Sequence, residues 1–518
     1  MARTFAKKTV PDALAGAIRA ISERRKLKLY AASVQNLDVG AVALARGERG
    51  RVLLLAWSAG ARPAAAGELA GAGDASGTGD VELQSHPASF GNAHTLGKHL
   101  PHLAPRCKGL ATALGLGDRL GLGTPGHIEA VRGTGLAPFL AQQSIREMTR
   151  TARSPEDVMR DAVFGALQAG WAGGFGSDAD HLKSSEDIDR TLAAGFTMFT
   201  IDPGDHVDAT ADAADASQLR EKVARLPWDA LDSSEADAQA RYAGREFTLA
   251  GGGTLAVSEE AFARAAAKYG RAVAHTARMY RHLVEVAGAR PFELEVSVDE
   301  TESPTTPEEH WFVASELARL EVKWVSLAPR YVGLFEKGVD FIGDLDALRA
   351  SLVRHAAVAR TLGPYKLGIH SGSDKFSVYP IAAELADGLV HVKTAGTSYL
   401  EALRVLARRR SALFREIFTF ARERYEEDKR TYHVSADLAK VPEPSAVPDA
   451  QLDAALDRFD DRQVLHVTFG SVLTAQNADG TPRFRARLLE ALLAHEDDYA
   501  EALRKHLGRH AAPFATKG

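Results

Sequence analysis

Short apolar runs alternate with longer helical stretches along most of the chain. Within the runs, apolar and polar residues alternate with the period of two that is typical of strands, and the stretches between them have the wider apolar spacing of amphipathic helices. Eight such units match an α/β protein with a TIM-like (β/α)₈ barrel, whose active site lies at the carboxyl ends of the strands. The predicted strands are Arg119–Gly123, Gly173–Ser177, Phe196–Asp202, Phe292–Val298, Val322–Ala328, Tyr365–His370, Leu389–Thr394 and Val464–Phe469.

The barrel pattern does not include the beginning of the chain. Residues 1–115 predict a small N-terminal α/β extension, and residues 116–518 predict the barrel domain. The interval 204–290 is long for one crossover between parallel strands, so we expect an insertion after the third predicted strand. Within it, Phe247–Val257 has the pattern of a hairpin.

Four of the predicted strands have a polar face. Phe292–Val298 alternates apolar residues with Glu293, Glu295 and Ser297. Because helices must cover the apolar face, we expect the polar face to point into the barrel lumen. Burying several ionisable groups together is costly unless they pair, bind a metal or meet a ligand. The corresponding polar positions in the other strands are Lys366, His370, His391, Lys393, His466 and Thr468.

Histidines are the candidate metal ligands. The 518 residues include 18 histidines but only one cysteine, Cys107, which excludes an internal disulfide and a cysteine-rich zinc site. His181, His370 and His391 lie at or near the ends of different predicted strands, where a barrel brings side chains together. One such histidine is usually structural, but three predict a site for Zn, Mn, Co or Ni. For His466, a fourth ligand, a substrate contact and a core position are all open.

Two carboxylates are candidates for acid/base catalysis. Asp180 is either a general base or the N-cap of the helix that follows it. Glu295 in mid-strand has no capping role, although a buried ion pair with a lumen lysine would also explain it. Asp299 and Glu300 follow the same strand and are alternatives.

A helix start after the seventh predicted strand is a candidate anion site. Thr397 and Ser398 follow Gly396 there, and the free backbone N–H groups of a first turn can hold an anion. Solvated surface positions are the alternative for two of the nearby cations, Lys375 and Arg330. The cations that would reinforce a carboxylate or phosphate pocket are Lys393, Lys375 and Arg330.

Composition excludes several classes of partner. The chain has 63 Lys+Arg against 68 Asp+Glu and a formal net charge of −5, which gives no general attraction for nucleic acid or anionic membranes. No apolar run approaches the roughly 20 residues of a bilayer span, and the first residues lack the apolar stretch of a signal peptide. We therefore expect a cytoplasmic protein.

A glycine motif suggests a competing function. Gly121, Gly123 and Gly126 match G-x-G-x-x-G, which is typical of a nicotinamide-dependent oxidoreductase. Pro125 within the turn, and the lack of a second strand ending in an acidic residue at the required distance, argue against it. Neither H-E-x-x-H nor G-x-S-x-G occurs, so a zincin protease and an α/β-hydrolase are not supported.

Six long segments carry a family resemblance: 119–130, 173–183, 296–310, 323–344, 363–384 and 388–404. They resemble the tagaturonate epimerase family of bacterial hexuronate catabolism. The resemblance implies a barrel enzyme that depends on a divalent metal and interconverts D-tagaturonate and D-fructuronate, a small-molecule ketohexuronate pair. It implies an acid/base pair of Asp180 and Glu295, and metal ligation by His181, His370 and His391.

The chemistry of these substrates suggests a mechanism. The two ketohexuronates differ at a carbon whose hydroxyl is β to the ketone, so its C–H bond is not acidified by enolisation. Retro-aldol cleavage, rotation of the aldehyde fragment and re-addition would invert this carbon. Two alternatives stay open: a metal-dependent ketose/aldose isomerase, which would form an aldose, and a non-catalytic sugar-acid-binding protein, which would bind without turnover.

Overall fold

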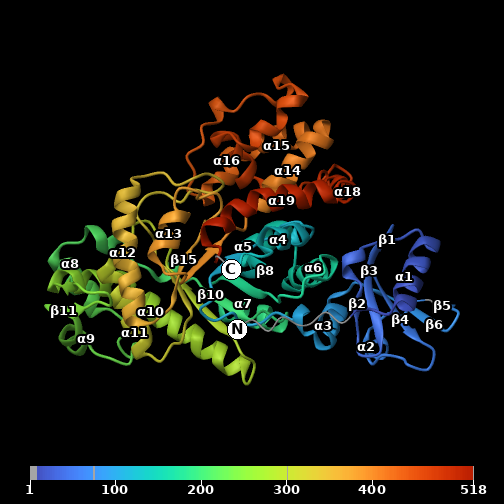
Figure 1. Cartoon of the computed structure of the whole chain (residues 1–518). Helices are drawn as coiled ribbons and strands as arrows, with labels where there is room; N and C mark the ends of the chain where they lie inside the picture. The colour runs from blue at the N-terminus through green and yellow to red at the C-terminus, as the bar shows by residue number, and fades with distance from the viewer. Residues whose placement is uncertain (1–8, 74–75, 300, 517–518) are drawn as a thin grey trace.

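Eight parallel strands close into a barrel, as the alternating pattern predicts. The computed structural model describes residues 9–73, 76–299 and 301–516, and Figure 1 shows the barrel between the blue N-terminal sheet and the green insertion. Around the barrel the strand order is β10-β13-β14-β15-β16-β7-β8-β9. In chain order the strands are β7 (Ala113–Gly115), β8 (Ala137–Ser144), β9 (Gly176–Leu182), β10 (Met198–Ile201), β13 (Glu293–Ser297), β14 (Ser326–Ala328), β15 (Lys366–Ile369) and β16 (Val390–Lys393).

Two of the predicted strands are wrong, and the first is a loop. In Arg119–Gly123 the backbone turns around the Asp118 carboxylate, which accepts hydrogen bonds from the N–H groups of Leu120, Gly121 and Gly123 at 2.9, 2.9 and 2.6 Å. Gly121 has a φ of +78°, which a strand does not allow. The barrel strand at this place is β7, just before the loop, so the barrel begins at residue 113 rather than 116.

The second wrong strand is helical. Val464–Phe469 lies within α16 (Phe459–Val467) and α17 (Phe469–Thr474), which are buried on nearly every side, and a short apolar run does not distinguish such a helix from a strand. The strand missing from the prediction is β8, all eight residues of which are buried. The neighbouring Gln142 and Gln143 interrupt its apolar pattern. The other predicted strands overlap barrel strands, although Gly173–Ser177 reaches only the first residues of β9.

An antiparallel sheet precedes the barrel. Its order is β1-β3-β4-β6-β5, with β2 paired to β3. Helix α1 (Asp12–Arg24) packs Ile18 and Ile21 against Ala43 and Leu54 of this sheet. The strands are β1 (Lys28–Leu29), β2 (Gln35–Asn36), β3 (Gly40–Gly47), β4 (Gly50–Ser58), β5 (Ser76–Thr78) and β6 (Val81–Pro87), and the short helix α2 is Ala65–Glu68.

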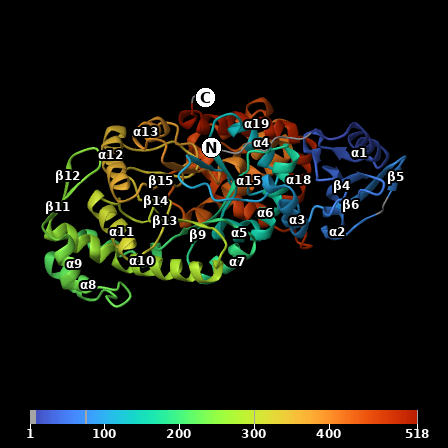
Figure 2. The same ribbon diagram turned by 60° about the horizontal axis from the view of Figure 1, so that its bottom comes forward.

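A long insertion follows β10. This is the fourth barrel strand, and it is third in the sequence prediction because that prediction omits β8. The antiparallel pair β11 (Arg245–Thr248) and β12 (Thr254–Val257) confirms the predicted hairpin. Figure 2 shows the hairpin beside α8 (Ala216–Ala224) and α9 (Glu235–Tyr242) at the end of the molecule far from the N-terminal sheet. The 29-residue helix α10 (Glu259–Ala287) then returns the chain to β13.

Helices cover the apolar outer face of the barrel. Leu294 and Val392 point toward this layer, and α7, α10, α11, α12 and α13 pack side by side. Among the described residues, no helix has the length and apolar character to cross a bilayer. The outer helices are α3 (Phe90–His99), α4 (Thr124–Val131), α5 (Ile145–Thr151), α6 (Pro155–Gln168), α7 (Ser185–Ala193), α11 (Pro307–Arg319), α12 (Leu345–Leu362) and α13 (Tyr379–Leu385). The C-terminal layer adds α14 (Thr397–Arg409), α15 (Ser411–Asp428), α18 (Arg485–Ala494) and α19 (Glu496–Ala511).

Candidate active site

Two adjoining cavities lie at the carboxyl ends of the barrel strands. The β9 cavity reaches Asp180, His181 and Lys393. The β14 cavity reaches Asp299 and Arg330. The mouth of a barrel is the usual place for a small-molecule ligand. The residues that line both cavities are Arg146, Lys337, His370, Ser371 and Tyr432.

A bulge in β9 sets the direction of the first two site residues. Ile201 of β10 pairs with Leu182, so β9 has one residue more than its neighbour between Ala179 and Leu182. His181 has a φ of +53° in this bulge. Few residues with a side chain adopt a positive φ, and those that do are concentrated at functional sites. Asp180 Oδ1 lies 2.8 Å from His181 Nδ1, so the bulge presents the two side chains as one unit.

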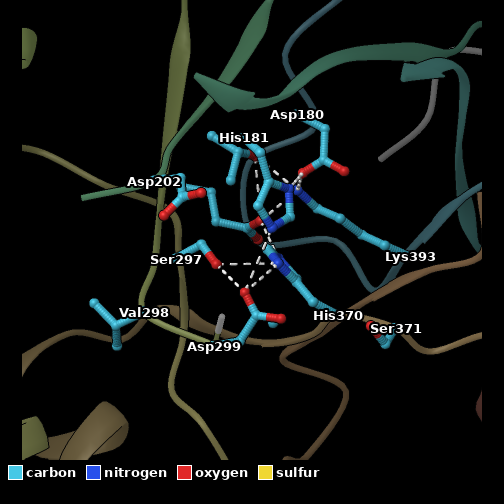
Figure 3. Close-up of polar contacts among 12 residues, drawn as sticks. Asp180, His181, Asp202, Ser297, Val298, Asp299, His370, Ser371 and Lys393 are labelled. Carbon is cyan, nitrogen blue, oxygen red and sulfur yellow. Dashed lines mark hydrogen bonds and ion pairs between the residues drawn. The ribbon is translucent and has the colours of Figure 1, made fainter. Parts of the chain in front are cut away.

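His370, just after β15, faces this unit across the barrel. Its Nε2 lies 2.6 Å from Glu295 Oε1, and its Nδ1 lies 3.1 Å from Asp299 Oδ1. Ser297 donates a hydrogen bond to Asp299, and His181 Nε2 lies 3.5 Å from the same Asp299 oxygen. Strands β9 and β15 are opposite each other in the barrel order, and Figure 3 shows the side chains converging over the lumen.

Lys393 lies below this cluster with its ammonium surrounded by acceptors. Its Nζ is 2.8 Å from Asp178 Oδ2, 2.7 Å from Asp180 Oδ1 and 2.6 Å from Glu295 Oε1. It also donates to the Thr200 hydroxyl at 2.7 Å. An ammonium has three N–H donors, so none is left for a substrate carboxylate. Lys393 therefore neutralises lumen carboxylates in this structure.

The charges of the cluster fix its protonation. Burial and Lys393 favour a neutral His370, but the Asp299 and Glu295 carboxylates outweigh them and raise the pKa of His370 to about 9. Although burial opposes ionisation, His181 and Lys393 hold the pKa of Asp180 well below its usual range. Against the same burial, His370 holds the pKa of Asp299 well below its usual range. The site thus carries ionised carboxylates around a cationic imidazole.

Two of the three predicted metal ligands come together, and the third does not. Asp180, His181 and His370 offer ligand atoms that all lie within 4.8 Å of one another. His391 lies deeper in the lumen, with its Nδ1 3.3 Å from Glu295 Oε2 and its ring centre 4.8 Å from that of Phe139, the two rings being tilted by 35°. Burial lowers the pKa of His391 to about 4. His391 belongs instead to a second group of possible ligand atoms, together with Asp178 and Glu295.

The predicted anion-binding side chains are mostly engaged elsewhere. Burial lowers the pKa of Lys375 to about 7, and its Nζ donates to the backbone carbonyls of Glu336, Val339 and Ser373. Ser398 donates to the Gly117 carbonyl at 2.7 Å. The Thr397 side chain is buried and lines neither cavity, and Arg330 lines the β14 cavity while donating to the Asp299 carbonyl at 3.4 Å.

His466 and Glu300 were left open by the sequence. His466 lies on α16 and not on a strand, and it lines the β9 cavity with its Nε2 3.5 Å from Arg119. A Cβ on Gly396 would lie 1.9 Å from the His466 ring, so only glycine fits at that helix start. Glu300 lies outside the described residues.

Several residues of the site escaped the sequence analysis. Asp178 is two residues before Asp180 on the same strand face, and the period of two would have identified it. Arg146 follows the unpredicted strand β8, and Lys337 lies in an irregular loop where no periodicity guides a prediction. Tyr432 comes from the C-terminal layer, which no barrel pattern connects to the mouth.

Comparison with known proteins gives concordant matches. The model of a family described as tagaturonate epimerase matches residues 30–513. A protein of Thermotoga maritima named tagaturonate/fructuronate epimerase is 43% identical over 419 residues, which are 81% of this chain and 84% of that protein. The native crystal structure of fructuronate-tagaturonate epimerase UxaE from Cohnella laeviribosi superposes with a TM-score of 0.88 at 35% identity, covering 97% of this chain and 99% of that one. A glycerol complex of the same enzyme also gives a TM-score of 0.88 at 35% identity, covering 96% of this chain and 99% of that one.

Proposed function

Because the chain belongs to the tagaturonate epimerase family, we propose that its barrel mouth interconverts D-tagaturonate and D-fructuronate by metal-assisted retro-aldol chemistry. The chain is a carbohydrate epimerase, as the resemblance implies. The observation that carries the proposed mechanism is the convergence of Asp180, His181 and His370 with the Asp299 carboxylate at the cavity.

The site fits a divalent cation. Asp180, His181 and His370 supply one oxygen and two nitrogens, a donor set that suits Zn, Mn, Co or Ni. The carboxylates of Asp299 and Glu295 compensate the positive charge of the His370 imidazolium, and a bound cation would replace the proton of that ring, because a ligating histidine must be neutral. Lys393 and Gln142 orient the Asp180 carboxylate from behind, as supporting groups do at metal sites. When bound, the cation would act as a Lewis acid toward the substrate ketone.

Two carboxylates reach the adjoining cavities, where protons must move. Asp180 lines the β9 cavity and Asp299 lines the β14 cavity, whereas Glu295 is fully buried beneath His370. We therefore assign proton transfer to Asp180 and Asp299, and we assign to Glu295 the orientation of His370 and Lys393. The two oxygens of Asp180 face different partners, since Oδ1 faces His181 and Oδ2 accepts a hydrogen bond from Gln142.

The proposed reaction uses these groups in sequence. One carboxylate takes the proton of the hydroxyl on the carbon to be inverted, and the bond from this carbon to the carbon next to the ketone breaks. The products are an enediolate and a three-carbon aldehyde that carries the substrate carboxylate. After rotation, the aldehyde accepts the enediolate on its other face, and the second carboxylate returns the proton. A semi-enclosed mouth keeps the fragments together.

Turnover in D₂O tests the mechanism. The hydrogen bonded to the inverted carbon is never removed in this scheme, so product formed from tagaturonate should carry no deuterium there. Stoichiometric deuterium at that carbon would rule out retro-aldol cleavage and favour deprotonation. Product analysis in the same experiment separates the alternatives: an aldose product would indicate an isomerase, and binding without turnover would indicate a sugar-acid-binding protein.

A further inference from the structure

Two cations stand where the β9 and β14 cavities meet, and nothing in the mechanism above uses them. Lys337 and Arg146 line both cavities. We propose that they bind the carboxylate of the hexuronate substrate, with Lys337 as the residue that selects sugar acids over neutral sugars. This inference rests on the proposed function and adds the substrate group that these residues recognise.

Lys337 is held beside the reacting end of the site. Its Nζ donates to the Ser371 hydroxyl at 2.6 Å, and Ser371 directly follows His370. Among the described residues, no carboxylate lies within ion-pair distance of this ammonium. The neighbouring Glu336 is used elsewhere, since its Oε2 accepts hydrogen bonds from Ser435 and Gln463. Lys337 thus has a neutral partner that an anion can join or replace.

Arg146 is positioned by its helix and by an aromatic ring. It lies in the first turn of α5, whose start is fixed by a capping box between Ser144 and Glu147. Its guanidinium lies 5.7 Å from the centre of the Tyr432 ring. Arg150, one helical turn further, donates to the Tyr432 hydroxyl and lies 4.9 Å from the centre of the same ring, so both arginines lie against one aromatic side chain. The guanidinium is therefore placed before any ligand arrives, which limits the entropy lost on binding.

Four other cations lie near the cavities. Arg119 forms hydrogen bonds of 2.8 and 2.6 Å to the Glu147 carboxylate and keeps one Nη without a hydrogen-bond partner among the described residues. Arg330 lines only the β14 cavity, and its Nε has no such partner either. The Lys393 ammonium is surrounded by three carboxylates, and the buried Lys375 ammonium donates to backbone carbonyls. The floor of the site thus carries carboxylates and histidines, and Lys337 lies where the two cavities meet. A ketohexuronate has its ketone toward one end and its carboxylate at the other, so the ketone can face the floor while the carboxylate meets Lys337.

The placement has a consequence for the proposed cleavage. The substrate carboxylate stays on the aldehyde fragment when the carbon–carbon bond breaks. A carboxylate held by Lys337 would keep this fragment in the cavity while its aldehyde group turns to present the other face. The remaining fragment, after its enediolate carbon takes the proton that the base removed, is dihydroxyacetone. Escape of either fragment is therefore measurable as dihydroxyacetone in solution.

The test compares Lys337→Met with the wild-type enzyme by two measurements. Calorimetric titration gives the Kd of tagaturonate and of the neutral sugar tagatose. Loss of a charge-assisted hydrogen bond should raise the Kd of tagaturonate about tenfold to a hundredfold and change that of tagatose less than about threefold. Dihydroxyacetone released per epimerisation, followed by an NADH-linked dehydrogenase, should rise at least about tenfold. Lys337→Arg should restore part of the affinity for tagaturonate and part of the retention of dihydroxyacetone. Lys505→Met, on the exposed face of α19, is the matched control.

Different outcomes address the two proposals separately. A wild-type protein that binds tagaturonate without epimerising it contradicts the proposed function, and the titration still decides the role of Lys337. Equal weakening of tagaturonate and tagatose binding in Lys337→Met would overturn the carboxylate assignment, as would unchanged binding of both. If Lys337→Met fails to fold, Arg146→Met in the same assays provides the second test.

Discussion

Lys393 Nζ lies 2.6 Å from Glu295 Oε1, in the middle of a lumen that also holds the buried carboxylates of Asp178 and Asp180. These groups come from three different strands, so one ammonium holds β9, β13 and β16 together at the floor of the cavity. Its position explains how several carboxylates remain ionised where burial alone would protonate them. We propose this structural role for Lys393 in place of the substrate-binding role that the sequence suggests.

We expect Lys393→Met to destabilise the protein and to lower kcat. Removing one partner of a buried ion-pair network leaves uncompensated carboxylates, which costs about 3–5 kcal/mol. Urea denaturation measures the free energy of unfolding, and steady-state kinetics measure kcat and KM. Lys366→Met is the matched control, because the Lys366 ammonium is also buried in the lumen but has no hydrogen-bond partner among the described residues. A raised KM for the uronate at unchanged stability would instead support the original substrate-binding role of Lys393.

We expect metal binding to depend on His181 and His370 but not on His391. Only the first two share a ligand group with Asp180. After chelation, a divalent ion titrated into His370→Ala should bind at least about tenfold more weakly than into the wild type. His391→Asn should keep the wild-type affinity, measured by calorimetry independently of turnover. Equal loss in both variants would restore the set of three histidine ligands that the sequence predicts.

The strand pattern predicted the floor of the site because period two is a property of local sequence. Glu295, Lys366, His370 and Lys393 were assigned to the lumen from alternation alone, and their contacts agree with it. Burial on both faces removes that signal. All eight residues of β8 are buried, including Gln142 and Gln143, so apolar and polar positions do not alternate along this strand. In the loop around Asp118, leucines and glycines alternate, which imitates a strand.

The cavity residues Lys337 and Tyr432 could not be predicted from the sequence, for a different reason. Lys337 and Tyr432 lie in loops, and their meeting depends on how distant segments pack. Lys375 shows the converse, since a lysine in a loop normally suggests solvent or an anion, but this one is capped by three backbone carbonyls. Whether a cation is free to bind a ligand is a property of tertiary contacts.

We expect Asp299→Asn and Glu295→Gln to fail in different ways. Asp299 reaches the β14 cavity, so its amide variant should lower kcat about 100-fold while the free energy of unfolding changes by less than about 1 kcal/mol. Glu295 is buried against His370 and Lys393, so its amide variant should lower the free energy of unfolding by about 3 kcal/mol. Steady-state kinetics on both variants measure kcat, and urea denaturation measures the free energy of unfolding. A stable but inactive Glu295→Gln beside an active Asp299→Asn would make Glu295 the acid/base residue, as the sequence suggested.

We expect stability to fall as the pH drops below about 6.5, in part because of His127. This ring is fully buried with its Nε2 2.7 Å from the Ser398 hydroxyl, and burial lowers its pKa to about 4 although the Asp118 carboxylate opposes the shift. Above pH ~6.5 the ring is neutral in both folded and unfolded protein. Between that pH and about 4 only the unfolded chain binds the proton, so the free energy of unfolding falls by about 1.4 kcal/mol per pH unit for this group. Urea denaturation at pH 7 and pH 5 should therefore show a loss that is about 2 kcal/mol smaller in His127→Gln than in the wild type, because glutamine does not titrate. Equal losses in the two proteins would show that His127 takes up its proton in the folded state.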